Sequence, residues 1–106
     1  MENKEYSLKF TFKAEDDLDE INRYIANNLF APEAAENLMD KIESDIMRLK
    51  AFPYSCSFVL DETLKKRGYR KLIIDNYIVF YLVSEQERQV IIMRILYGAS
   101  NYQTIL

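Results

Sequence analysis

The first apolar positions along the chain alternate with polar ones. Tyr6, Leu8, Phe10 and Phe12 occupy every second position, with a polar residue between each pair. Successive side chains of a strand point to opposite sides, so this pattern predicts a strand over residues 6–12 with one buried face.

The spacing then changes to that of a helix. Leu18, Ile21, Ile25 and Leu29 recur three or four positions apart, which places them on one stripe of an amphipathic helix. Acidic residues are expected in its first turn, where the helix dipole favours negative charge. These residues are Glu15, Asp16 and Asp17.

A second helix is expected to begin at Pro32, because proline suits the first helical position, where its missing N–H would have no partner. Pro53 is expected to end this helix. The link between the two helices is very short, so they must pack antiparallel as a helical hairpin. The apolar stripe of the second helix consists of Ala35, Leu38, Met39, Ile42, Ile46 and Leu49.

Three strands are predicted in the second half of the chain, over residues 68–74, 77–84 and 89–97. Tight turns at Asp75-Asn76 and at Glu85-Gln86-Glu87 join them, so the strands form an antiparallel meander. Residues 53–66 have no clean period and are interpreted as a loop with room for one helical turn.

The predicted fold is therefore α+β, with the element order β-α-α-β-β-β. The helical hairpin is expected to pack on one face of a small, mostly antiparallel four-stranded sheet. No linker, repeat or low-complexity segment interrupts the chain, so residues 1–106 are expected to form a single domain.

The centre of this sheet is apolar on both faces. In the middle strand of the meander, Tyr77, Val79, Tyr81 and Val83 point one way, and Ile78, Phe80 and Leu82 point the other. Strict alternation in the last strand would place Arg94 on the side of Val90, Ile92 and Leu96. One pair of helices covers one face only, so the second face needs the 53–66 loop, the tail or another molecule as a cover.

Composition excludes several kinds of chemistry. The 106 residues contain no histidine, two glycines and a single cysteine, Cys56. Histidine-based catalysis, a zinc site and a phosphate-binding glycine loop are therefore not expected, and neither a cofactor nor a metal is predicted. No apolar run approaches the roughly 18 residues of a membrane helix. The expectation is a cytoplasmic protein without a membrane partner.

Charge is distributed unevenly. Residues 1–50 carry twelve acids and seven bases, whereas residues 51–106 carry five acids and seven bases, which together give the net charge of −3. The bases concentrate between Lys65 and Lys71, where they number five and no acid intervenes. This stretch could contact a polyanion locally, or it could be a solvated turn that protects an edge strand from aggregation.

Several stretches together resemble the RelE/ParE toxins of bacterial type II toxin–antitoxin modules. They are the helix LDEINRYI, the sequence GYRKL that leads into NYIVFYLV, and the ending RILYG. The resemblance covers nearly the whole chain. It implies the fold described above, and a cognate antitoxin that is small, acidic and partly disordered and that folds as it binds.

The resemblance leaves two mechanisms open. RelE-like members cleave messenger RNA on the ribosome without a metal, and they typically carry an arginine at the position that Ile78 occupies here. They also tend to place basic residues or histidine just after the last strand, where this chain has Ser100 and Asn101. A ribonuclease would have to use Arg70, Lys71, Arg94 and Tyr102 instead.

These departures favour the ParE-like branch, whose members are linked to DNA gyrase and act by binding rather than by catalysis. The residues expected to bind the target or the antitoxin are Lys65, Lys66, Arg67, Ile78, Phe80, Leu82, Arg94 and Tyr97. Two alternatives remain: a decayed toxin that still binds its antitoxin, and a small α+β domain with another role. The acidic residues Asp16, Asp17, Asp19 and Glu20 are interpreted as a solvated helix face.

Overall fold

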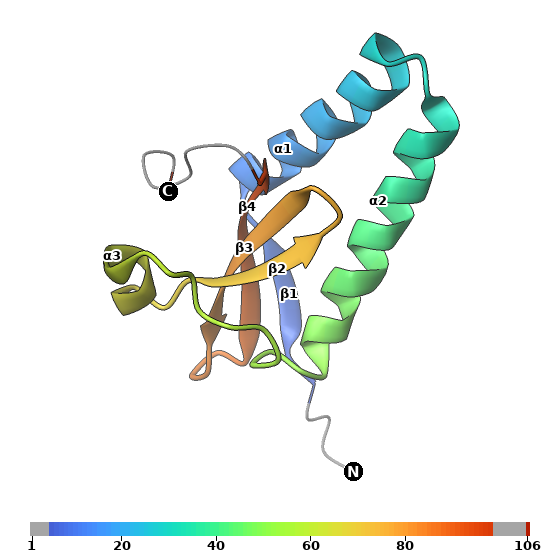
Figure 1. Cartoon of the computed structure of the whole chain (residues 1–106). Helices are drawn as coiled ribbons and strands as arrows, with labels where there is room; N and C mark the ends of the chain where they lie inside the picture. Colours follow the sequence, from blue (N-terminus) through green and yellow to red (C-terminus); the bar gives the residue numbers. More distant parts are fainter. Residues whose placement is uncertain (1–4, 99–105) are drawn as a thin grey trace.

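The computed structural model describes residues 5–98 and 106, and its elements follow the predicted order (Figure 1). The strands are β1 (Ser7–Phe10), β2 (Arg70–Ile74), β3 (Tyr77–Ser84) and β4 (Gln89–Tyr97). The α-helices are α1 (Phe12–Arg23), α2 (Pro32–Met47) and the short α3 (Glu62–Lys66). The first continues as a π-helical turn, η1 (Tyr24–Asn28), and the second continues as a 3₁₀ turn, η2 (Arg48–Lys50). The α+β prediction is confirmed.

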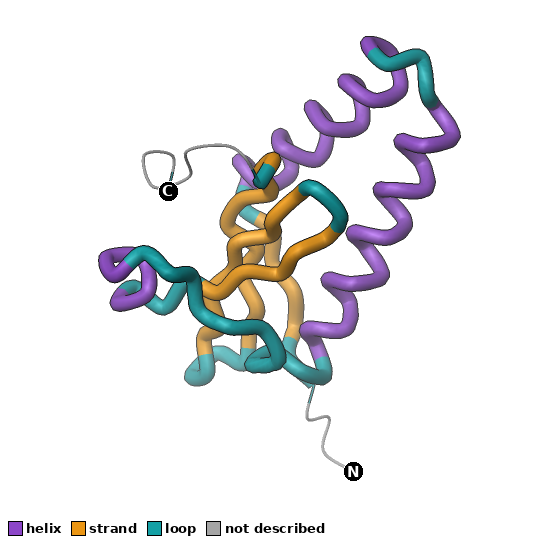
Figure 2. The backbone as a smooth tube through the Cα atoms, in the orientation of Figure 1, coloured by secondary structure: helices purple, strands orange, loops and turns teal. Residues whose placement is uncertain are grey.

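The four strands form one mixed sheet in the order β1-β4-β3-β2. The meander pairs antiparallel, whereas β1 lies parallel to β4 at one edge. Helices α1 and α2 form the hairpin on one side of the sheet, and α3 with its flanking loops lies apart from this hairpin (Figure 1, Figure 2).

The first strand is shorter than the alternation predicts. It ends at Phe10, and Thr11 takes an extended conformation in which its side-chain oxygen accepts a hydrogen bond from the Ala14 N–H. Threonine is a favoured N-cap, so α1 starts at Phe12. Phe12 is consequently 85% exposed and does not share the buried face of the strand, contrary to the sequence prediction.

The second helix begins at Pro32 as predicted but ends before Pro53. Its α-helical part stops at Met47, and the 3₁₀ turn carries the chain to Lys50. Pro53 is buried instead, and its carbonyl accepts a hydrogen bond of 3.0 Å from the Tyr81 hydroxyl.

A β-bulge corrects the predicted facing of the last strand. Phe80 pairs with Arg94 and Tyr81 pairs with Ile92, so Met93 is an additional residue on β4. An extra residue reverses the alternation beyond the bulge. Arg94 therefore lies on the face of Phe80, away from Val90 and Ile92, because directly paired residues share a face.

The two faces of the sheet carry separate apolar clusters. The larger cluster lies between the sheet and the hairpin. The smaller one surrounds the fully buried Phe80 on the opposite face, and it is closed by Val59, Leu64 and Tyr69 from the segment that contains α3. The chain thus supplies much of its own cover for the second face, and Leu106 also packs there.

Candidate functional site

An ion pair joins the hairpin to the last strand. The Arg94 guanidinium donates two hydrogen bonds to the Asp17 carboxylate, from Nε at 2.8 Å and from Nη2 at 2.9 Å. The Asp17 carboxylate also accepts the Ile95 N–H at 2.9 Å. Asp17 is buried, so it is not part of a solvated acidic face. The side-chain hydrogen bond between Arg94 and Asp17, together with the attraction between their charges, raises the pKa of Arg94.

This ion pair lies at the edge of β4, beyond the point where β1 ends and no longer pairs with it. The strand β1 stops at Phe10, and its pairing with β4 reaches only to Ile92. Further along β4, the Thr11 hydroxyl donates to the Met93 carbonyl at 2.8 Å, and Asp17 receives the Ile95 N–H. Two polar side chains of the α1 segment thus replace strand partners, because a buried backbone group needs a hydrogen-bond partner.

Arg70 is likewise occupied within the fold. Its Nη1 donates to the Cys56 carbonyl at 2.6 Å, and its guanidinium carbon lies 4.0 Å from the centroid of the Phe58 ring and 5.1 Å from that of Tyr54. These contacts attach residues 54–58 to the start of β2. Among the described residues, neither Arg70 nor its neighbour Lys71 forms an ion pair with an acid of the hairpin.

The basic residues before β2 lie on and just after α3. Asp61 caps this helix by accepting the Leu64 N–H at 3.0 Å, and Lys65 and Lys66 are exposed in its last turn. Arg67 follows and lies over the Tyr69 ring, with 5.1 Å from its guanidinium carbon to the ring centroid. The short helix α3 lies within residues 53–66, where the sequence analysis left room for one helical turn.

The apolar residues predicted to bind a partner differ in accessibility. Phe80 is fully buried beneath Val59 and Leu64, so its ring is not accessible at the surface, and its role in binding stays a prediction. Ile78 and Leu82 are half-buried at the border of the same cluster. Tyr97 is exposed at the end of β4, and Tyr102, like Ser100 and Asn101, lies outside the described residues.

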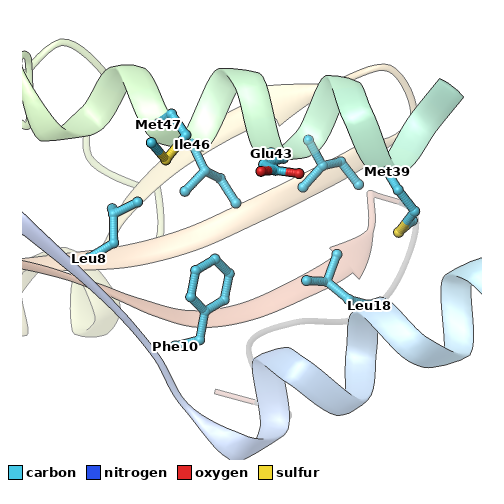
Figure 3. Close-up of a pocket in the computed structure, with 8 residues that line it drawn as sticks. Leu8, Phe10, Leu18, Met39, Glu43, Ile46 and Met47 are labelled. Carbon is cyan, nitrogen blue, oxygen red and sulfur yellow. The ribbon is translucent and has the colours of Figure 1, made fainter. Parts of the chain in front are cut away.

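An apolar groove lies on the other side of the sheet, between β1 and the hairpin (Figure 3). It encloses about 360 Å³. The side chains that enter it come from β1, α1 and α2, and they are Leu8, Phe10, Leu18, Met39, Ile42, Glu43, Ile46 and Met47. Among these, Glu43 is the one ionisable side chain, and β1 beside the groove is an edge strand of the sheet.

The sequence analysis did not identify this groove as a site. All of its residues except Glu43 and Met47 belong to the apolar faces that the sequence analysis expected to be buried, and periodicity cannot distinguish a filled interface from an open one. One signal was present in the sequence. Met39 in the stripe of α2 and Met47 beside it have flexible side chains, and methionine is over-used at adaptable binding surfaces.

Residues 5–98 and 106 contain no group of three histidine, cysteine or acidic side chains placed to hold a metal ion. Within the same residues, no helix is both long and apolar enough to cross a membrane.

Comparison with known proteins identifies the family. Residues 8–102 match the family model described as the ParE toxin of the type II toxin–antitoxin system parDE. The fold is similar to a structure of the chromosomal ParDE system from P. aeruginosa, with a TM-score of 0.72 and 25% sequence identity over 90% of this chain and 98% of that one. It is also similar to a chain of the toxin–antitoxin complex RelBE2 from Mycobacterium tuberculosis, with a TM-score of 0.61 and 18% identity over 88% of this chain and 98% of that one.

The search of curated proteins found no significant match. The family model spans far more than half of the chain, and the fold as a whole is similar to that of the solved ParDE structure. The chain belongs to the ParE toxin family of type II toxin–antitoxin systems, within the RelE/ParE superfamily.

Proposed function

We propose that this chain inhibits growth by binding a cellular protein, DNA gyrase, without catalysis of its own, and that a cognate antitoxin neutralises it. The observation that carries the proposal is the occupation of the cationic side chains. Arg94 is held by Asp17, and Arg70 is held by the Cys56 carbonyl and the Phe58 ring. A metal-free ribonuclease needs such cations free to stabilise charge on the transferring phosphate, and each missing stabiliser costs about 10²–10³ in rate.

The sequence adds to this argument. Ile78, at the position where the resembling ribonucleases have an arginine, is half-buried against the Phe80 cluster. The exposed Lys65 and Lys66 lie on a separate short helix, which gives a surface for binding rather than an arrangement for catalysis. Binding to a target protein therefore agrees better with the residues than RNA cleavage does.

The apolar groove is the proposed docking site of the antitoxin. Both similar structures are described as toxin–antitoxin systems, which supports a partner of this kind. An antitoxin segment that folds on binding would place apolar side chains among Leu8, Phe10 and Met47, and its backbone could extend the sheet at β1. Glu43 in the groove favours a basic residue at one position of that segment.

Expression with and without the antitoxin tests the function. The chain is expressed from a tightly regulated promoter, alone or together with a small acidic open reading frame from its gene neighbourhood, where the antitoxin is expected. Growth arrest with a DNA-damage response, together with inhibition of gyrase supercoiling by the purified chain, is expected when the antitoxin is missing. Cleavage of messenger RNA on ribosomes would contradict the proposal, and antitoxin binding without growth arrest would identify a decayed toxin.

A pair of matched substitutions tests the groove. Met47 lies in the groove and is 47% exposed, whereas Leu60 lies outside it and is 81% exposed. Met47→Asp would place an unpaired carboxylate against apolar side chains, so antitoxin affinity should fall by about 100-fold or more. Leu60→Asp should leave affinity unchanged, and calorimetry showing equal effects would move the antitoxin away from the groove.

A further inference from the structure

A second cavity lies at the opposite end of the hairpin, between α1 and the ends of β3 and β4. It encloses about 730 Å³. Three tyrosines line it, Tyr24 from the hairpin, Tyr77 from β3 and Tyr97 from β4, and the exposed Glu20 contributes its acidic side chain. The cavity shares no lining residue with the apolar groove.

The three tyrosine rings line one cavity and remain accessible to solvent. Tyr77 and Tyr97 contact each other edge to face, with ring centroids 5.8 Å apart and an interplanar angle of 73°. Tyr24 and Tyr97 are 52% and 53% exposed. Burial raises the pKa of Tyr77, and so do the nearby phenols of Tyr97 and Tyr24, which agrees with three hydroxyl groups in one neighbourhood.

The charge around this cavity is negative. Glu20 is its ionisable acid, and no lysine or arginine is among its described lining residues. Arg94 lies near enough for Glu20 to raise its pKa, but the guanidinium itself is paired with the Asp17 carboxylate. The helical run that contains Tyr24 ends at Asn28, beside the lining residue Leu29, and the C-terminal end of a helix carries partial negative charge. Aromatic ring faces add negative potential, so the cavity has the chemistry that attracts a cation.

The backbone at this end of the hairpin departs from regular geometry. The helix passes into the π-helical turn Tyr24–Asn28, and such turns are frequent at functional sites. Phe30 follows in the left-handed region at φ 52° and is 87% exposed, an uncommon conformation for a bulky residue. Leu29 and Phe30 therefore extend an apolar surface beyond the cavity, which suits a protein partner better than a small cation.

We propose that this aromatic cavity receives an arginine side chain of the protein that the toxin arrests. A planar guanidinium can stack on a tyrosine face and pair with a carboxylate, which an ammonium group does less well. The assignment to the target, rather than to the antitoxin, rests on the proposed function and on the separation of this cavity from the groove.

A titration with a small probe tests the chemistry of the cavity independently of that function. The folded chain is titrated with Nα-acetyl-arginine methylamide and with the neutral analogue built on citrulline, while NMR follows the tyrosine ring signals. The arginine probe should shift the signals of Tyr24, Tyr77 and Tyr97 and bind about fivefold more tightly than the citrulline probe. Equal affinity of the two probes would overturn the cation assignment.

Matched variants separate the cavity from general attraction to an acidic surface. Glu20→Gln and Tyr97→Leu should each abolish the preference for arginine. Glu33→Gln, which removes an exposed carboxylate in the first turn of α2, should preserve it. An equal loss in Glu33→Gln would show that the probe senses only the charge of the hairpin.

The same variants decide which partner uses the cavity. Glu20→Gln and Tyr97→Leu should each reduce the growth-inhibiting activity of the toxin about tenfold. The affinity of each variant for the antitoxin should stay within about twofold of wild type. Loss of antitoxin affinity with growth arrest intact would overturn the assignment to the target. If the wild-type chain arrests nothing, the proposed function and this assignment fail together, whereas the probe titration still decides whether the cavity binds a guanidinium.

Discussion

Removing the Asp17 carboxylate should destabilise the fold strongly. Asp17→Ala takes away both hydrogen bonds of the Arg94 guanidinium and the partner of the Ile95 N–H. Asp17 is buried, and the side chain of Arg94 retains only 18% of its accessibility, so water cannot fully replace the lost partner.

The magnitude follows from these contacts. Breaking a buried ion pair by removing one partner commonly costs about 3–5 kcal/mol, because the other charge stays buried without compensation. Part of that penalty is relieved here by the remaining accessibility of Arg94, while the orphaned Ile95 N–H adds about 1–3 kcal/mol. The free energy of unfolding should fall by about 4 kcal/mol, a large share of the roughly 5–15 kcal/mol that stabilises a small domain.

A double-mutant cycle in urea measures this effect. The chains compared are wild type, Asp17→Ala, Arg94→Ala and the double variant, and the coupling energy of the pair should be about 1.5–3 kcal/mol. Asp16→Ala is the control, because Asp16 is exposed on the same helix and should change stability by less than about 0.5 kcal/mol.

Two outcomes would refute the reasoning. A coupling energy below about 0.5 kcal/mol would mean that Asp17 and Arg94 do not stabilise each other in solution. An equal loss of stability in Asp16→Ala would mean that the helix dipole, and not the ion pair, explains the effect.

Three further predictions concern the core, the pH dependence and the start of α1. Phe80→Ala should cost about 3–5 kcal/mol because the ring is fully buried, whereas Phe12→Ala, at an exposed ring, should cost less than about 0.5 kcal/mol in the same urea titration. Burial raises the pKa of the Tyr81 hydroxyl above its ordinary value, so the folded state holds this proton more tightly than the unfolded chain. Stability should therefore be unaffected by this group below about pH 10 and should fall as the pH rises beyond it. Tyr81→Phe should make that fall less steep in denaturation curves from about pH 8 to 11.5, although Tyr77, whose pKa is also raised, keeps part of it. Thr11→Ala should cost about 1–2 kcal/mol by thermal unfolding, because it removes the N-cap and the donor to the Met93 carbonyl.

Each of these predictions has a contradicting result. Equal costs for the two phenylalanine variants would place Phe80 in a loosely packed region. If stability falls above pH 10 as steeply in Tyr81→Phe as in wild type, the pH dependence belongs to another group. If Thr11→Ala is as stable as wild type, water replaces the oxygen of the N-cap.

The sequence by itself determined the elements and their order. The change from a two-residue to a helical period separated β1 from α1, and Pro32 marked the start of α2 at the residue where the structure has it. The predicted strands 68–74, 77–84 and 89–97 agree with β2, β3 and β4 within two residues. These features follow from local physics, because side-chain direction and turn chemistry depend on neighbours in sequence.

The tertiary structure alone decided what the charged residues do. Asp17 and Arg94 are separated by 77 positions, and no local pattern shows that β1 stops early enough for a helix side chain to occupy the edge of β4. The bulge at Met93 decides which face receives Arg94, and it arises from the pairing of β3 with β4. A periodic reading assumes unbroken alternation, so it placed Arg94 on the wrong side.

The surfaces available for binding also depended on packing. The apolar run of β3 indicated that both faces of the sheet need a cover, but only the folded chain shows that Val59, Leu64 and Tyr69 close over Phe80 while a groove remains beside β1. Sequence fixes how many apolar side chains exist and how they alternate. Which of them stay open to a partner is set by long-range contacts, because burial is a property of the whole fold rather than of neighbouring residues.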